Sequence, residues 1–282
     1  MSTAALPEEQ GGNGAFEALG PIERFFADVA RVTLGIFAEI GRRVFFGGEI
    51  ARGLGEVRTY MPLLAAQMNS IGVGSVPLAG TVAAFIGAVT AYQTRYQLFP
   101  GVPYSTVGWI TRQSIVLEIG PLLTGLVLAG RVGAQMTAEI GTMRVTEQID
   151  ALETLAYDPV AYLVVPRLIA STVMLPLLTV LSIAIGIVAG LIVAVVATDV
   201  RLSDFTEGLQ LTFSTFQVFY AIIKATLFGA AIALVCSYEG YMTSSGAEGV
   251  GRSTARAVVI SSVVILFLDA LTALYLAPYL QS

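Results

Sequence analysis

Five long apolar stretches dominate the chain, and they predict an all-α integral membrane protein. Stretches 59–94 and 168–198 carry no charged residue, and stretches 113–130, 208–238 and 257–280 carry one each. About 20 helical residues, at about 1.5 Å each, cross the hydrocarbon core of a bilayer. We therefore expect five transmembrane helices, over about residues 61–94, 108–138, 160–198, 208–238 and 257–280.

The first 58 residues have a different pattern. Residues 1–20 are polar and aperiodic, which predicts a disordered tail. Within 21–46, apolar residues recur at helical spacing while Arg24, Asp28 and Arg31 lie on the other side. This pattern predicts an amphipathic helix at the membrane interface, or a helix packed on a partner. We expect an interfacial helix and connector over 21–58 and one membrane domain over 59–280.

Composition excludes several kinds of chemistry. Hydrophobic residues make up 55% of the chain and charged residues 12%, and histidine is absent. Catalysis by a Ser-His-Asp triad and HExxH zinc sites are therefore excluded. The single lysine, Lys224, lies in an apolar run, so the chain has no Walker A motif. We expect no cofactor and no metal, and the net charge of −5 argues against nucleic acid.

The arginines orient the predicted spans, because positive residues concentrate on the cytoplasmic side of a membrane. With the N-terminus in the cytoplasm, eleven arginines lie inside and three lie outside (Arg95, Arg112 and Arg201). Five spans then place the C-terminus in the periplasm.

Small residues recur every four positions within the spans. The stripes are Ala83, Gly87 and Ala91; Gly125, Ala129 and Gly133; and Gly186, Gly190 and Ala194. Such stripes allow close helix packing in lipid, either within the chain or at a homodimer seam. Pro121 and Pro176 interrupt spans and predict kinks.

The connection between the second and third spans is polar but has helical order. Ile149, Leu152 and Leu155 share an apolar face, and Glu147 and Asp150 lie elsewhere. We expect a short amphipathic helix over about 142–157. It either docks into a groove of another protein or lies on the bilayer surface.

Charges within the spans need partners or a wet cavity. Glu118, Lys224 and Asp269 either pair with one another and fix the helices, or line a headgroup cavity and relay motion. Arg95 and Tyr96 end the first span. Arg95 holds a lipid phosphate bidentately, or the two residues form an interfacial anchor.

Several motifs, in order along residues 20–280, resemble those of the MlaE/YrbE permeases, which are membrane subunits of MCE-type ABC transporters. The matching runs are Phe85-Ile86-Gly87 followed by Gln93, Glu118-Ile119-Gly120-Pro121, Ala129-Gly130-Arg131-Val132-Gly133, Ala138-Glu139-Ile140-Gly141, Thr142-Met143-Arg144-Val145, Thr146-Glu147-Gln148-Ile149-Asp150-Ala151-Leu152, Asp158-Pro159, Leu175-Pro176-Leu177-Leu178-Thr179, Lys224, Gly240-Tyr241, Leu268-Asp269 and Leu271-Thr272-Ala273-Leu274.

The resemblance implies a homodimer in the bacterial inner membrane that moves lipid, by default phospholipid, between inner and outer membranes. It also implies a cytoplasmic ATPase dimer docked at the 142–157 coupling helix, and a periplasmic MCE-domain protein, expected as a hexamer. We therefore assign coupling to Arg144, Glu147, Gln148, Asp150 and Leu152. Candidate substrate-binding residues are Gln93, Arg95, Tyr96 and Glu118.

Two other classes of function fit part of the sequence. An ion-coupled secondary transporter would use Glu118, Lys224 and Asp269, although five spans do not divide into two equal repeats. An intramembrane aspartyl enzyme needs two aspartates at membrane depth, and Asp269 is the one that qualifies. We expect a transport subunit without catalytic residues of its own.

Overall fold

The computed structural model describes residues 41–244 and 246–280, and the chain divides into two compact units, the second of which begins at Glu49. The tail predicted over 1–20 and most of the helix predicted from residue 21 lie outside the described residues. In the first unit, residues 41–48 are helical.

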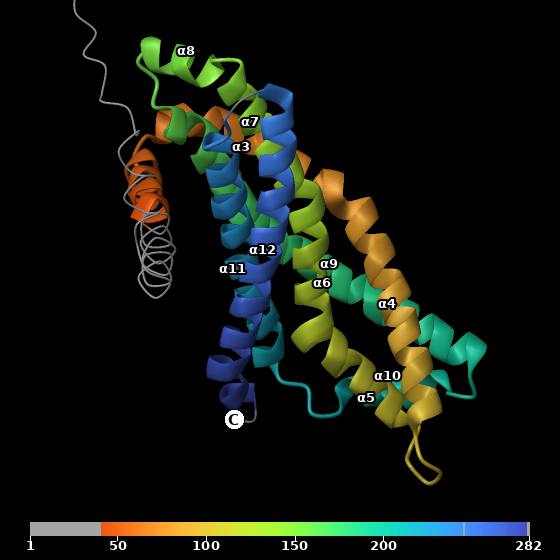
Figure 1. Ribbon diagram of the computed structural model, residues 1–282. Helices are drawn as coiled ribbons and strands as arrows, with labels where there is room; N and C mark the ends of the chain where they lie inside the picture. The colour runs from red at the N-terminus through yellow and green to blue at the C-terminus, as the bar shows by residue number, and fades with distance from the viewer. Residues whose placement is uncertain (1–40, 245, 281–282) are drawn as a thin grey trace, which may run out of the picture. The chain divides into compact units, whose positions relative to one another are not determined.

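Five helical spans make up the second unit, as predicted (Figure 1). The first comprises α3 (Val57–Ile71), a 3-10 turn at Val73–Ser75 and α4 (Val76–Gln97). The second comprises α5 (Ser105–Ser114), α6 (Gly120–Leu128) and α7 (Ala134–Val145), joined by π-turns at Ile115–Ile119 and Ala129–Gly133.

The remaining spans are less interrupted. The third is α9 (Val165–Ala197), preceded by a π-turn at Val160–Val164. The fourth is α11 (Thr215–Tyr241), and the fifth is α12 (Gly246–Leu276), followed by a 3-10 turn at Ala277–Leu280. Helix α9 continues through Pro176, whereas a π-turn directly precedes the helix that contains Pro121.

The fourth span begins at Thr215, so the predicted start at residue 208 is wrong. Residues Leu202–Gln210 form a separate helix, α10. The Asp204 carboxylate accepts a hydrogen bond from the Arg201 backbone N–H, which caps the start of α10. Leu211 is extended and Thr212 has a φ of 52°, and these conformations end the helix before Ser214 caps α11.

The predicted helix over 142–157 is also divided. Helix α7 ends at Val145, and α8 (Gln148–Thr154) begins a new direction after Glu147, whose φ is 59°. Left-handed backbone at a non-glycine residue cannot continue a right-handed helix. The chain therefore turns at Glu147, and α8 is a separate seven-residue element.

Small residues bring the spans together within the chain. A Cβ atom at Gly87 of α4 would collide with the backbone of Gly186 of α9, so these helices touch backbone to backbone. The middle stripe packs on α11, with Gly125 against Phe228 and Gly133 against Cys236. All three stripes thus include residues that serve packing within the chain, the first of the two roles considered for them.

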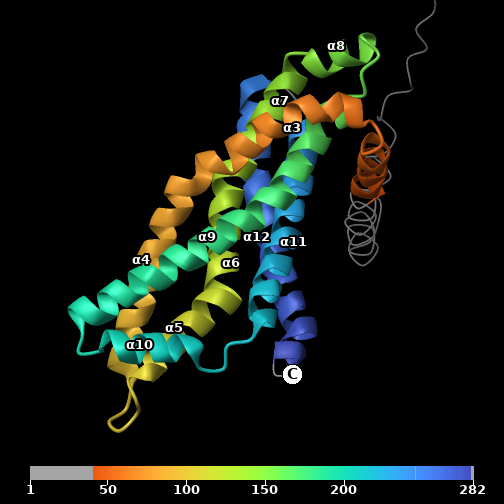
Figure 2. The same ribbon diagram turned by 180° about the vertical axis from the view of Figure 1, so that it is seen from behind.

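The second unit has two distinct ends (Figures 1 and 2). Helix α8 lies at one end, beyond α7, and α10 lies at the other, beside α5. Helices α5 and α10 cross closely, because Gly108 faces the Phe205 carbonyl and Gly208 faces the Ser105 carbonyl. We refer to these as the α8 end and the α10 end.

Candidate functional site

Three charges predicted to lie within the spans meet in the structure. The Lys224 ammonium on α11 lies 2.8 Å from a Glu118 carboxylate oxygen and 2.7 Å from one of Asp269. The Lys224 side chain is fully buried, Asp269 is 10% exposed and Glu118 is 46% exposed. The three groups link the second, fourth and fifth spans, and they carry one net negative charge when all are ionised.

Pro121 contributes to this cluster through the backbone. A proline has no N–H, so Pro121 cannot donate to the carbonyl of Leu117, four residues earlier. The Leu117 carbonyl accepts a hydrogen bond of 3.3 Å from the Lys224 ammonium. Lys224 therefore binds both a carboxylate and a backbone carbonyl of the segment Leu117-Glu118-Ile119-Gly120-Pro121.

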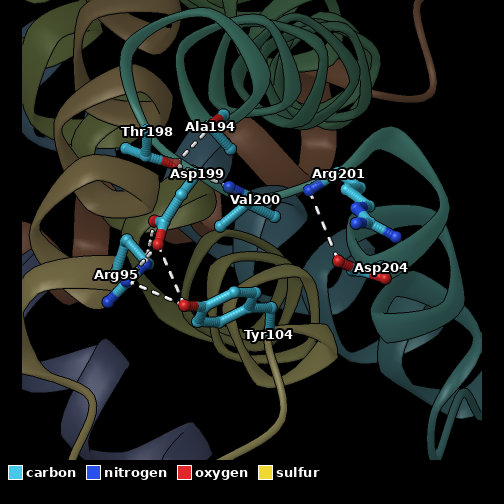
Figure 3. Close-up of polar contacts among 8 residues, drawn as sticks. All are labelled: Arg95, Tyr104, Ala194, Thr198, Asp199, Val200, Arg201 and Asp204. Carbon is cyan, nitrogen blue, oxygen red and sulfur yellow. Dashed lines mark hydrogen bonds and ion pairs between the residues drawn. The ribbon is translucent and has the colours of Figure 1, made fainter. Parts of the chain in front are cut away.

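A second cluster lies at the α10 end (Figure 3). Arg95, in the last turn of α4, donates from Nε to Asp199 Oδ1 at 2.5 Å and from Nη2 to Asp199 Oδ2 at 2.6 Å. The Tyr104 hydroxyl donates to Asp199 Oδ2 at 2.9 Å, and the Arg95 guanidinium lies 4.5 Å from the Tyr104 ring centre. We call Arg95, Tyr104 and Asp199 the Arg95 clamp.

The connection between α9 and α10 positions Asp199. Thr198 leaves the helix with extended backbone, and its hydroxyl donates to the Ala194 carbonyl and accepts from the Val200 N–H (Figure 3). Arg201 then begins the capped start of α10. The backbone is thus hydrogen-bonded on both sides of Asp199, while the Asp199 side chain itself is 56% exposed.

Arg95 keeps Asp199 ionised. The hydrogen bonds from Arg95 and then from Tyr104 hold the pKa of the Asp199 carboxyl well below its usual range. Asp199 therefore remains a charged partner of Arg95 at any pH near neutrality.

The four candidate substrate-binding residues do not form one site. Gln93 and Tyr96 are exposed, and the Tyr96 ring packs against Tyr92 with ring centres 4.7 Å apart and ring planes tilted by 51°. Arg95 is engaged by Asp199, and Glu118 belongs to the cluster around Lys224. Asp199 and Tyr104 were missed, because one aspartate after a span and one tyrosine in a loop show no sequence signal.

The predicted coupling residues gather around α8. Glu147, Gln148 and Asp150 are exposed, Leu152 is half-buried, and Ile149 is fully buried and anchors the helix. Arg144 of α7 forms a 2.7 Å ion pair with Asp150. Further along α7, Glu139 pairs with the buried Arg167 at 3.0 Å, which links α7 to α9.

Arg112 has a structural role that the sequence did not reveal. It is 3% exposed, and its guanidinium donates to the carbonyls of Leu209 at 2.8 Å and Leu211 at 3.0 Å. These carbonyls end α10, where the helix dipole is negative. Beside them, the Trp109 indole N–H donates to the Thr212 hydroxyl at 2.7 Å.

An apolar crevice lies between α4, α6 and α9. It is lined by small and branched side chains, including Ala83, Ile119 and Leu123. The Ser182 hydroxyl also lines it and has no hydrogen-bond partner among the described residues. The crevice is suited to hydrocarbon rather than to a charged group.

Comparison with known proteins identifies the family of this chain. The family model for the permease MlaE matches residues 64–275. The intermembrane phospholipid transport system permease protein MlaE of Haemophilus influenzae is 35% identical over 251 residues, which cover 88% of this chain and 95% of that protein.

Two further relatives carry a less specific name. A probable ABC transporter permease protein of Rickettsia prowazekii is 40% identical over 207 residues, covering 73% of this chain and 80% of the relative. One of Synechocystis is 42% identical over 199 residues, covering 71% of this chain and 76% of the relative. The family match and the identity to these relatives together show that the chain belongs to the MlaE permease family.

Proposed function

We propose that this chain is the membrane subunit of an ABC transporter that moves phospholipid between the inner and outer membranes. A relative over nearly the whole chain is named a phospholipid transport permease, which supports the substrate class. The observation that carries the proposal is α8, a short helix held beyond the spans with an exposed acidic surface.

The energy comes from a separate ATPase in this proposal. The one lysine of the sequence is fully buried and paired with Glu118 and Asp269, so it is not offered to a nucleotide phosphate. An ATPase dimer docks at α8 in the cytoplasm, and basic residues on it face Glu147 and Asp150. The N-terminus is then cytoplasmic and the C-terminus periplasmic.

The contacts around α8 suggest how movement of the ATPase reaches the spans. A push on α8 passes to α7 through the Arg144–Asp150 ion pair and the buried Ile149. From α7 it passes to α9 through the Glu139–Arg167 pair. Helix α9 packs on α4 across Gly87 and Gly186, so α4 and α9 move together beside the apolar crevice.

Two copies of the chain complete the transport pathway in this proposal. A homodimer encloses a path for acyl chains, and an MCE-domain protein, as a hexamer, receives or delivers lipid at the α10 end. This polypeptide makes and breaks no covalent bond. It converts movement of the ATPase into movement of lipid.

The proposal is tested at Glu147, which is exposed and has no side-chain partner among the described residues. We expect Glu147→Arg to weaken co-purification of the ATPase and to lower lipid-stimulated ATP hydrolysis. The matched control is Glu207→Arg, the same charge reversal on the exposed side of α10 at the other end. Equal retention of the ATPase by both variants would falsify docking at α8.

A direct transport assay separates this function from ion-coupled transport. The complex, reconstituted in vesicles, should move fluorescent phospholipid when ATP is present and stop when it is removed. Movement driven by a proton or sodium gradient without nucleotide would instead favour the secondary transporter, with Glu118, Lys224 and Asp269 as the coupling groups.

A further inference from the structure

The Arg95 clamp has the geometry of an occupied anion site. Two adjacent guanidinium nitrogens, Nε and Nη2, each donate to a different oxygen of one carboxylate, at 2.5 and 2.6 Å. This parallel arrangement is the one by which arginine binds phosphate as well as carboxylate. The Asp199 carboxylate therefore stands where two oxygens of a phosphate would fit.

The clamp also lies at the depth of lipid headgroups. Helix α4 ends at Gln97, two residues after Arg95, and α9 ends at Ala197, two residues before Asp199. Exposed aromatic side chains surround this end of the first span, namely Tyr92, Tyr96, Phe99 and Tyr104. Aromatic residues gather where hydrocarbon meets water, so Arg95 lies near the level at which phospholipids carry their phosphates.

Asp199 is placed so that it can leave Arg95 while the fold stays intact. Its side chain is 56% exposed, and the hydrogen bonds that fix its loop come from the Thr198 hydroxyl and from the backbone of Arg201. Rotation of the Asp199 side chain alone releases the guanidinium to another anion. Because exposed ion pairs are weak, this exchange is easily reversed.

Protonation does not open the clamp near neutral pH. The Asp199 carboxyl has a pKa well below its usual range, owing first to Arg95 and then to Tyr104. Of the other charged groups at the α10 end, Arg201 lies on the same connection, Asp204 and Glu207 lie on α10, and Arg112 binds the carbonyls of Leu209 and Leu211. A competing anion is therefore the means by which Asp199 is displaced.

We propose that Arg95 is a headgroup phosphate site for phospholipid, which Asp199 occupies as an internal substitute until lipid arrives. The inference rests on the proposed function, because it gives the transported lipid a place to enter or leave the α10 end. When the phosphate binds, Asp199 turns to water and the link between α4 and the α9–α10 connection is released. Tyr104 remains stacked on the guanidinium and keeps it oriented.

The proposal predicts that substitutions of Arg95 and of Asp199 have opposite effects on lipid binding. The full-length chain in an uncharged maltoside detergent is titrated with dioctanoyl phosphatidylglycerol, and binding is measured by calorimetry. Arg95→Gln should weaken binding at least about tenfold, because it removes the positive charge and the paired hydrogen bonds of the guanidinium. Asp199→Asn should tighten binding by at least about threefold, because a larger fraction of Arg95 is free to bind.

The controls separate a binding site from a structural brace. Arg201→Gln removes a neighbouring exposed arginine and should leave binding unchanged. Arg95→Lys keeps the positive charge and should retain part of the affinity, which covers the case in which Arg95→Gln fails to fold. A reversed pair, Arg95→Asp with Asp199→Arg, keeps a brace but moves the cation, and should not restore binding.

Several results would overturn the proposal. These are weaker binding in both single variants, no change in either, or full recovery in the reversed pair. Equal binding of dioctanoylglycerol, which has no phosphate, would exclude the headgroup as the group recognised. Equal binding of inorganic phosphate would assign the site to free phosphate instead. The assay contains no ATP and no ATPase, so its failure is distinct from failure of the α8 docking test.

Discussion

The Lys224 ammonium lies 3.3 Å from the carbonyl oxygen of Leu117, a carbonyl to which Pro121 has no N–H to donate. Within the span, the Lys224 ammonium thus donates to a carbonyl that receives no hydrogen bond from residue 121, and that carbonyl helps to solvate the buried charge. The same ammonium binds Glu118 and Asp269, so one side chain fixes the second, fourth and fifth spans relative to each other.

Removal of Lys224 should be strongly destabilising. In Lys224→Ala, Asp269 is left buried without its cation, at a cost of about 3–5 kcal/mol. We expect lower yield of folded protein, a lower thermal midpoint in detergent and loss of lipid transport. The control is Leu227→Ala, a truncation of an exposed side chain on the same helix, α11.

A neutral version of the same cluster provides a second check. Lys224→Met combined with Glu118→Gln and Asp269→Asn leaves no buried charge unpaired, so it should recover much of the lost stability. Wild-type transport in Lys224→Ala alone would contradict any essential role for the cluster.

The contact between α4 and α9 should tolerate no added side chain. Gly87→Ala places a methyl group onto the Gly186 backbone, which must move away, at a cost of about 1–3 kcal/mol. Gly130→Ala is the matched control, since a Cβ there meets nothing within 4 Å. Thermal unfolding of the two variants in the same detergent measures the difference, and equal midpoints would show that α4 and α9 are not in backbone contact.

Arg112 should hold α10 in place. In Arg112→Gln the carbonyls of Leu209 and Leu211 lose charge-assisted hydrogen bonds worth about 1.5–3 kcal/mol each. Trp109 reports the result, because it is the single tryptophan of the sequence and its indole is bonded to Thr212 after α10. We expect red-shifted emission and faster amide exchange over 202–210. Arg201→Gln should show neither change.

The contribution of the Arg95 clamp to the stability of the fold should depend on pH only in strongly acidic solution. The pKa of Asp199 is lowered in the folded chain by Arg95, so the clamp stabilises the fold above the ordinary aspartate pKa of about 3.9. That stability is lost as pH falls through the lowered value. The difference in thermal midpoint between the wild type and Asp199→Asn should therefore be constant from pH 7 to about 4.5, and should shrink below about pH 4. A difference that disappears near pH 6 would mean that Arg95 does not hold Asp199 ionised.

The sequence by itself determined the five spans, because a helix that crosses hydrocarbon must be long and apolar, and both are local properties of the chain. It also identified Glu118, Lys224 and Asp269 as charges that need partners. It placed the start of the fourth span at residue 208, because residues 208–214, at the end of α10 and in the turn after it, carry no charge, whereas α11 begins at Thr215. The single predicted helix at 142–157 failed for a similar reason, since helical periodicity does not reveal a left-handed residue such as Glu147.

Only the tertiary structure decided which groups meet. Arg95 and Asp199 are 104 residues apart, and two whole helical spans, the second and the third, lie between them in the sequence. They come together because α4 and α9 pack through glycines and end at the same level. Spacing along the chain predicts which residues are neighbours on one helix. Contact between helices depends instead on how their surfaces pack. The Arg95–Asp199 ion pair at the α10 end results from that packing.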